Sequence, residues 1–393
     1  WTLIIRSDIL RQLGYKFKRY SELAAELRDN PRPLTMDDLK VEPAISTPDD
    51  FYDFLKKVKS LNLKIGSKDV VPFSIMNWQL YHFSSLFGSC LWSKDPNGEI
   101  NGFYGHQYAK DYWQYVRKLY KEGLLDPDFS LQKDEQFIQK ATAGVIASTI
   151  YWCPGDKTVF TGIVETNPEY EWIRIPMPHL PDVKPYTDEQ IPAGCIFMIN
   201  SKFKDSERLV KYFDWFYSDE AFDVITWGPE SAGLYTVVDG KKQFKDLELW
   251  NLVKTGTPKK KGYDYYGLYT PALNDRPGSM AVSAAPFMQY FNPLDPRNNY
   301  PYENDFFNEP WAILGQFNAA TDGSSMGNGS DAANAAQNFM WNDWLSNSAS
   351  LYNAASDSDF EKAWNELYSK FMEKGMYEEA KNEMTKYINS RSK

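Results

Sequence analysis

The residues of this chain that most clearly suit a chemical task are aromatic side chains at the end of an apolar run. The run 145–152 predicts a buried strand, and its last residues, Tyr151 and Trp152, come directly before a Cys-Pro-Gly turn. Two aromatic faces beside a turn could stack on the weakly apolar C–H faces of sugar rings. Aromatic residues make up 16% of the chain, including 13 Trp and 26 Tyr. A large core with many half-buried Tyr would explain the same composition, so both interpretations stay open.

Patterns that would indicate catalysis are weak. The segment 323–327 matches the G-x-S-x-G of hydrolases, but that site needs a His after its serine, and His82, His106 and His179 all precede Ser325. We interpret the match as chance. The chain has no Walker A, HExxH or strand-linked GxGxxG pattern. A glycosidase would need only two carboxylates facing across a cleft, which one sequence does not exclude.

Composition excludes several other classes of protein. The net charge of −10 and the pI near 5.0 argue against a nucleic-acid partner. Three Cys and three His lack the number and spacing of a disulfide framework or a zinc site. No run of 18 apolar residues predicts a membrane span. A length of 393 residues predicts two domains or lobes, and 42% hydrophobic residues indicate a globular protein.

The elements that would position the aromatic residues alternate between strands and helices, which predicts α/β lobes. Apolar residues at helical spacing predict a helix over 108–121, ended by Gly123 in a left-handed conformation. A second helix should end at Gly144, directly before the strand 145–152. Further helices are expected after the Thr47 cap and over 206–217, 359–374 and 377–388, with strands at 1–6, 70–75, 172–176 and 193–200 and a hairpin within 228–240. Residues 15–46 are predicted to form a polar surface excursion.

The order of these pieces resembles the extracellular solute-binding proteins of bacterial ABC importers, family 1 (sugar-binding), and especially the Gram-positive lipoprotein branch. Residues 3–14 resemble the family's I-R-x-D-x-L-x-x-L-G, and 119–129 are close to its L-Y-x-E-G-L-I-D-P-D-F. Residues 47–55, 213–220 and 360–387 resemble its P-x-T-x-D-E-F helix start, its D-W-x-Y-S-D-E-G and its closing helices. The matching pieces span nearly the whole chain, and their shared order is more specific than any one of them.

The resemblance implies a two-lobed periplasmic-binding-protein type II fold, from which the N-terminal part of the first lobe is missing here. It implies four segments: 1–14 as a hinge-proximal strand and helix, 15–180 as the second lobe, 181–270 as the rest of the first lobe, and 271–393 as a return to the second lobe with the C-terminal helices. Because the chain begins within an expected strand, we predict that it is truncated. Many relatives carry a calcium loop where residues 66–69 stand, so this departure removes the family's usual metal, and no cofactor is expected.

The resemblance also implies a function: non-catalytic binding of an oligosaccharide or related carbohydrate between two lobes, and delivery to the permease subunits of an ABC importer. Its ligand-binding candidates are aromatic residues and one acid: Trp78, Tyr81, Tyr151, Trp152, Trp344, Trp92, Trp311 and Glu230. For the aromatic candidates, packing in the core is the alternative. The expected location is extracellular, at the surface of a Gram-positive bacterium or periplasmic, with membrane attachment only through an N-terminal lipid anchor not present in this chain. A glycosidase or lyase, a peptide-binding receptor and a signalling sensor of the same fold remain as alternatives.

Overall fold

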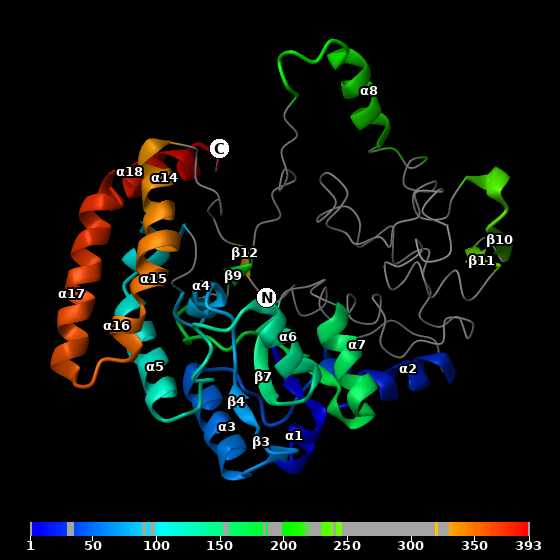
Figure 1. Ribbon diagram of the computed structural model, residues 1–393, viewed down its shortest axis with the longest axis horizontal. Helices are drawn as coiled ribbons and strands as arrows, with labels where there is room; N and C mark the ends of the chain where they lie inside the picture. Colours follow the sequence, from blue (N-terminus) through cyan, green and yellow to red (C-terminus); the bar gives the residue numbers. More distant parts are fainter. Residues whose placement is uncertain are drawn as a thin grey trace. The chain divides into compact units, whose positions relative to one another are not determined.

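The computed structural model (Figure 1) describes the greater part of the two ends of the chain and parts of its middle. The described residues are 2–29, 35–88, 92–94, 99–151, 157–183, 186–187, 199–216, 218, 220, 229–238, 241–245, 319–320 and 330–391. The chain divides into two compact units: unit 1 is Trp1–Glu189 with Pro301–Lys393, and unit 2 is Gln190–Tyr300. The predicted assignment of segments to lobes stays a prediction.

A four-stranded sheet forms the centre of unit 1. Its order is β4 (Val71–Phe73), β7 (Ile146–Tyr151), β1 (Thr2–Arg6) and β8 (Trp172–Ile175). β4 is parallel to β7, whereas β1 is antiparallel to both of its neighbours. Every residue of β1, β7 and β8 is buried, which indicates that both faces of the sheet are covered. The predicted strands in these four regions are confirmed.

Helices and short strands surround the sheet. The helical elements up to residue 170 are α1 (Ser7–Gln12), α2 (Tyr20–Asp29), η1 (Met36–Leu39), α3 (Pro48–Ser60), α4 (Gln79–Phe83), η2 (Ser84–Phe87), η3 (Phe103–Gly105), α5 (Ala109–Lys121), α6 (Asp134–Thr142), α7 (Lys157–Thr166) and η4 (Pro168–Tyr170). The short strands form the pairs β2 (Lys64–Ile65) with β3 (Lys68–Asp69), β5 (Ser93–Lys94) with β6 (Ile100–Asn101), and β9 (Tyr186–Thr187) with β12 (Ala319–Ala320).

Local signals in the sequence set several of these boundaries. Thr47 caps α3, because its hydroxyl accepts from the Asp50 amide at 3.1 Å and donates to the Asp50 carboxylate at 2.8 Å. Gly123 and Gly144 follow α5 and α6 with φ of 61° and 75°, the left-handed conformation that glycine adopts without strain. The predicted ends of both helices are thereby confirmed.

The C-terminal helices complete unit 1. They are α14 (Asp331–Asn338), the π-helical η8 (Phe339–Trp344), α15 (Leu345–Asn347), α16 (Ala349–Tyr352), α17 (Asp357–Lys374) and α18 (Tyr377–Arg391). α16 packs on both α5 and α17, and α14 packs on α18 (Figure 1). The helix predicted over 359–374 is confirmed as α17, and its inner face buries Phe360, Trp364, Leu367 and Phe371.

Two segments differ from the sequence-based expectation or refine it. The expected surface excursion at 15–46 contains α2 and η1, and its apolar residues Tyr20, Leu23 and Leu39 are buried. The Tyr20 hydroxyl accepts from the Arg174 amide at 2.9 Å, so tertiary contact with β8 orders this segment. The residues at 66–69 lie in the β2–β3 hairpin, where Lys64 pairs with Asp69 at 2.8 Å. Within the described residues, no group of three or more His, Cys, Asp or Glu side chains could hold a metal ion.

Unit 2 is described in part. It contains α8 (Ser206–Phe216), η5 (Glu230–Ala232) and an antiparallel pair of strands, β10 (Tyr235–Val238) and β11 (Lys241–Phe244). The predicted helix over 206–217 and the predicted hairpin are confirmed. The predicted strand at 193–200 falls largely outside the described residues. None of the helices in the described parts of the chain is both long and apolar enough to cross a bilayer.

Candidate functional site

The carboxyl ends of β4 and β7 meet at one edge of the sheet in unit 1. Register places Phe73 of β4 beside Ser148 of β7, while Thr2 at the start of β1 lies opposite Tyr151. Ligands of α/β proteins bind at the carboxyl edge of the strands. The loop 74–78, here named the β4–α4 loop, leaves the sheet at this edge and leads directly into α4.

An aromatic patch lies around the start of α4, made of Trp78, Tyr81, His82 and Trp341. The Tyr81 ring lies 5.0 Å from that of His82 and 5.2 Å from that of Trp341, and the Trp78 ring stands edge-on to His82 at 5.9 Å. Tyr81 is buried, whereas the other three side chains are partly exposed. The Nδ1 atom of His82 is nevertheless buried, and this burial lowers the pKa of the imidazole well below its usual value, so the ring is neutral at pH 7.

Three further candidates lie within the hydrophobic core of unit 1. Tyr151 is 3% exposed and stacks on Phe137 of α6. Trp92 is 1% exposed and stacks on Tyr377 of α18. Trp344 is fully buried, and its nearest rings, all within 5.6 Å, are those of Tyr104, Trp364 and Phe371. Their burial matches the packing role left open as the alternative, and a ligand role for them stays a prediction.

The remaining candidates are not brought into this patch. Trp152 and Trp311 lie outside the described residues. Glu230 is exposed at the start of η5 in unit 2. The patch therefore unites two of the eight sequence-based candidates, Trp78 and Tyr81, and their role in binding also stays a prediction.

Sequence reasoning missed Trp341 and His82. The segment 339–344 reads Phe-Met-Trp-Asn-Asp-Trp, and two tryptophans three positions apart lie near each other on a helix. That spacing does not indicate which one faces the core. The π-helical conformation of η8 buries Trp344 and leaves Trp341 partly exposed beside Tyr81. His82 could have been proposed as a neighbour of Trp78, because it follows that residue by one helical turn.

Unused hydrogen-bond acceptors lie next to the patch. The side-chain amide oxygens of Asn77 and Gln132 are buried and have no hydrogen-bond partner among the described residues. The Gln132 amide nitrogen donates to Ser74 Oγ at 3.1 Å and to the Ile75 carbonyl at 3.0 Å, which places this side chain against the β4–α4 loop. Aromatic faces beside amide groups are suited to a ligand that combines C–H faces with hydroxyl donors.

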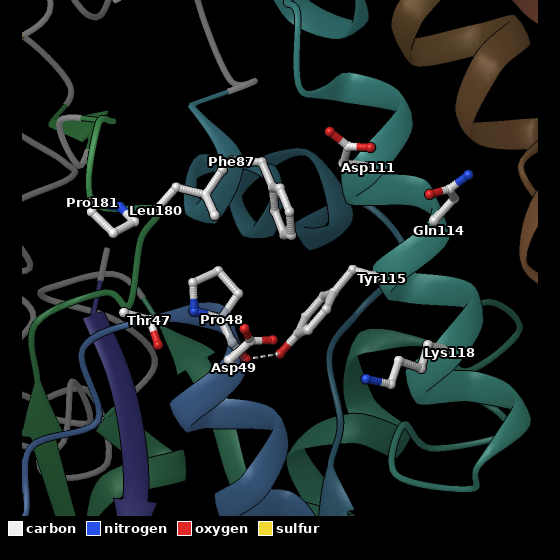
Figure 2. A pocket seen from close by; sticks show the side chains of 10 residues that line it. All are labelled: Thr47, Pro48, Asp49, Phe87, Asp111, Gln114, Tyr115, Lys118, Leu180 and Pro181. Atoms are coloured by element: carbon white, nitrogen blue, oxygen red, sulfur yellow. Dashed lines mark hydrogen bonds between the residues drawn. The ribbon is translucent and has the colours of Figure 1, made fainter.

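A pocket of about 380 Å³, which no residue of the aromatic patch lines, lies in unit 1. Figure 2 shows that the start of α3, the side of α5, Phe87 and the segment after β8 form its walls. Its lining residues are Thr47, Pro48, Asp49, Phe87, Asp111, Gln114, Tyr115, Lys118, Leu180 and Pro181. Burial and the nearby Asp49 carboxylate raise the pKa of Tyr115 well above its usual value, and its hydroxyl donates to the Pro48 carbonyl at 2.7 Å. None of the predicted ligand residues lines this pocket.

Comparison with known proteins gives a consistent fold. No protein-family model and no curated protein sequence matches the chain. The solved alginate-binding protein AlgQ2, without calcium ion, matches with a TM-score of 0.57 at 17% identity, over 99% of this chain and 71% of the other. An HMO-binding solute-binding protein associated with an ABC transporter of Bifidobacterium longum infantis gives 0.54 at 15% identity, over 98% and 74%. The Streptococcus pneumoniae substrate-binding protein FusA, in complex with kestose, gives 0.53 at 14% identity, over 100% and 72%.

These matches establish the fold. The predicted α/β class is confirmed, and the chain shares the fold of solute-binding proteins associated with ABC transporters. Each of the solved chains is longer than the part that this chain matches, so each contains segments with no counterpart here. The resemblance drawn from the sequence motifs is thus confirmed at the level of the fold.

Proposed function

We propose that this protein binds an oligosaccharide without converting it, and that it delivers the ligand to the permease subunits of an ABC importer. The observation that carries the proposal is the fold shared over nearly the whole chain with an alginate-binding protein, an HMO-binding protein and a substrate-binding protein in complex with kestose. The aromatic patch at the carboxyl edge of the sheet supports it, since Trp78 and Trp341 leave indole surface accessible to a ring-shaped ligand.

The proposed binding mechanism depends on an equilibrium between an open and a closed state of the protein. In the family that the sequence resembles, two lobes close on the ligand, and closure is favoured only by contacts that improve in the closed state. We propose that the patch is a ligand-facing surface of unit 1. The indole faces would stack on sugar C–H faces, while the amide group of Asn77 orients the hydroxyls.

The proposal includes a place in the cell. A binding partner of an importer works outside the cytoplasmic membrane, so we propose an extracellular or periplasmic location, with a lipid anchor at the surface in a Gram-positive host. Protease accessibility on intact cells, compared with a cytoplasmic marker, tests the location.

The test of function is calorimetric titration of the protein with alginate, fructan and milk-type oligosaccharides, followed by chromatography of each ligand after incubation. We expect binding of at least one ligand, which is recovered unchanged. Trp78→Ala should weaken that binding by about tenfold or more, because the loss of one buried stacking face at a binding hot spot has that size.

The matched control is Tyr368→Ala, which removes a partly exposed aromatic ring on α17, away from the patch. It should bind like the wild type. Release of shortened products would instead indicate a glycosidase or lyase. Binding of peptides in place of sugars would indicate the peptide-binding alternative.

A further inference from the structure

The loop that presents Trp78 is held by a buried polar network on the side of α6. Ser74 is fully buried, and its hydroxyl donates to the Asp126 carboxylate at 2.7 Å. The same hydroxyl accepts from the Gln132 amide, which also donates to the Ile75 carbonyl. The loop is thus bound through one side chain and one carbonyl to the segment between α5 and α6.

The Asp126 carboxylate at the centre of this network is 1% exposed, so its charge needs a partner. Lys140 of α6 supplies it, with its ammonium 2.8 and 3.1 Å from the two oxygens. Burial alone would lower the pKa of Lys140, but the hydrogen bonds to Asp126 and Asp128 outweigh burial and raise it. The Asp126 amide also donates to the Phe73 carbonyl at 2.8 Å, at the last residue of β4. Asp126 therefore holds both the end of the strand and the start of the loop.

A second attachment holds the other end of the loop. Gln79 is fully buried at the start of α4. Its side-chain oxygen accepts from the Met76 amide at 2.8 Å, and its side-chain nitrogen donates to the Ile150 carbonyl at 3.1 Å, next to the end of β7. Trp78 lies between the two attachments, so its backbone is fixed from both sides before any ligand arrives.

We infer that Ser74, Asp126, Gln132, Lys140 and Gln79 form a clamp that positions the β4–α4 loop and thereby sets the affinity of the aromatic patch. This inference rests on the proposed function. None of these residues needs to touch the ligand, so they are positioning residues. A loop that is ordered before binding loses less conformational entropy when the ligand binds. If a substitution breaks the clamp, the loop must be ordered on binding, and this entropy cost lowers the affinity. The clamp also gives a role to Asp126 within the motif at 119–129.

The test compares Ser74→Ala, Gln79→Met and Gln132→Met with the wild type by calorimetric titration and by fluorine NMR of protein labelled with fluorotryptophan. The Trp78 resonance is assigned as the one that is absent from the spectrum of the Trp78→Phe variant. In each folded clamp variant we expect that resonance to broaden or shift without ligand, and affinity to fall by about tenfold. The matched control is Ser148→Ala, because the equally buried Ser148 hydroxyl donates to the Pro72 carbonyl at 2.7 Å within the sheet and does not hold the loop. It should leave resonance and affinity unchanged.

The clamp is refuted if the folded variants keep both the wild-type Trp78 resonance and the wild-type affinity. Should Ser74→Ala or Gln79→Met unfold, Gln132→Met decides the matter, because that side chain is partly exposed. A wild-type protein that binds no oligosaccharide would overturn the proposed function instead. The Trp78 resonance would then still show whether the clamp orders the loop.

Discussion

At the scale of single residues, burial separates tryptophans that the sequence presents as equivalent. Trp344 is fully buried among three aromatic rings, whereas Trp78 and Trp341 are partly exposed. Residue type and helical spacing describe all three equally well, because both are local properties. Which indole faces the core depends on the packing of η8 against α17 and α4, which one sequence does not specify. This is why Trp78 and Tyr81 could be named as candidates from the sequence while Trp341 was missed.

A buried carboxyl group makes stability depend on pH. Glu171 is fully buried, and burial raises the pKa of its carboxyl to about 7, although the hydroxyl and amide of Ser21 donate to it. Between about pH 4.5 and 7 the folded state keeps a proton that the unfolded state has already lost. The free energy of unfolding should therefore fall as pH rises through this window, by on the order of 3 kcal/mol in total.

Urea unfolding at several pH values tests this, with Glu171→Gln as the variant that cannot ionise. Glu171→Gln should remove that part of the fall and be more stable than the wild type at pH 8. Glu379→Gln, at an exposed position on α18, serves as the control and should follow the wild type. Equal pH profiles for wild type and Glu171→Gln would show that the carboxyl is already ionised in the folded protein at low pH.

At the scale of elements, what the sequence predicted well was set locally. The cap at Thr47, the glycine stops at Gly123 and Gly144, and the apolar face of α17 all depend on residues within a few positions of one another. The helix α2 was missed because its order comes from distant contacts, such as that of Tyr20 with β8. The attachment of the β4–α4 loop could not be predicted for the same reason, because Ser74 and Asp126 are 52 positions apart.

The cap of α3 is expected to contribute measurably to stability. Thr47→Ala removes the hydroxyl that accepts from the Asp50 amide, and should lower the free energy of unfolding by about 1 kcal/mol. Thr47→Ser keeps the oxygen and should stay close to the wild type in the same urea titration. If both variants lose stability equally, the threonine methyl group rather than the cap is responsible.

At the scale of the whole molecule, unit 1 is built from two stretches of sequence that unit 2 separates. Its core joins Trp92 and Tyr104 from the first stretch with Trp344, Phe371 and Tyr377 from the second. The α/β class was predictable because alternation of strands and helices is a property of the whole sequence. The resemblance also implied that the chain returns to the second lobe at 271–393, and this assignment of segments to lobes stays a prediction.

The second stretch should be essential for the folding of the first. A fragment of residues 1–330 lacks α14 to α18, so the ring of Trp92 loses its contact with Tyr377 and the ring of Tyr104 loses its contact with Trp344. We expect it to bind hydrophobic dyes and to lack a cooperative thermal transition. Addition of a peptide covering 330–393 should restore the transition at least in part. A fragment that melts like the full chain would show that the first stretch forms a sufficient core alone.

The division of unit 1 into two stretches also affects when its core can form during synthesis. The strands of the sheet are synthesised before the helices α14 to α18, which supply part of the same core. The core of unit 1 can therefore be completed only after the second stretch has been synthesised. During that interval the apolar residues of the first stretch are exposed to association with other chains.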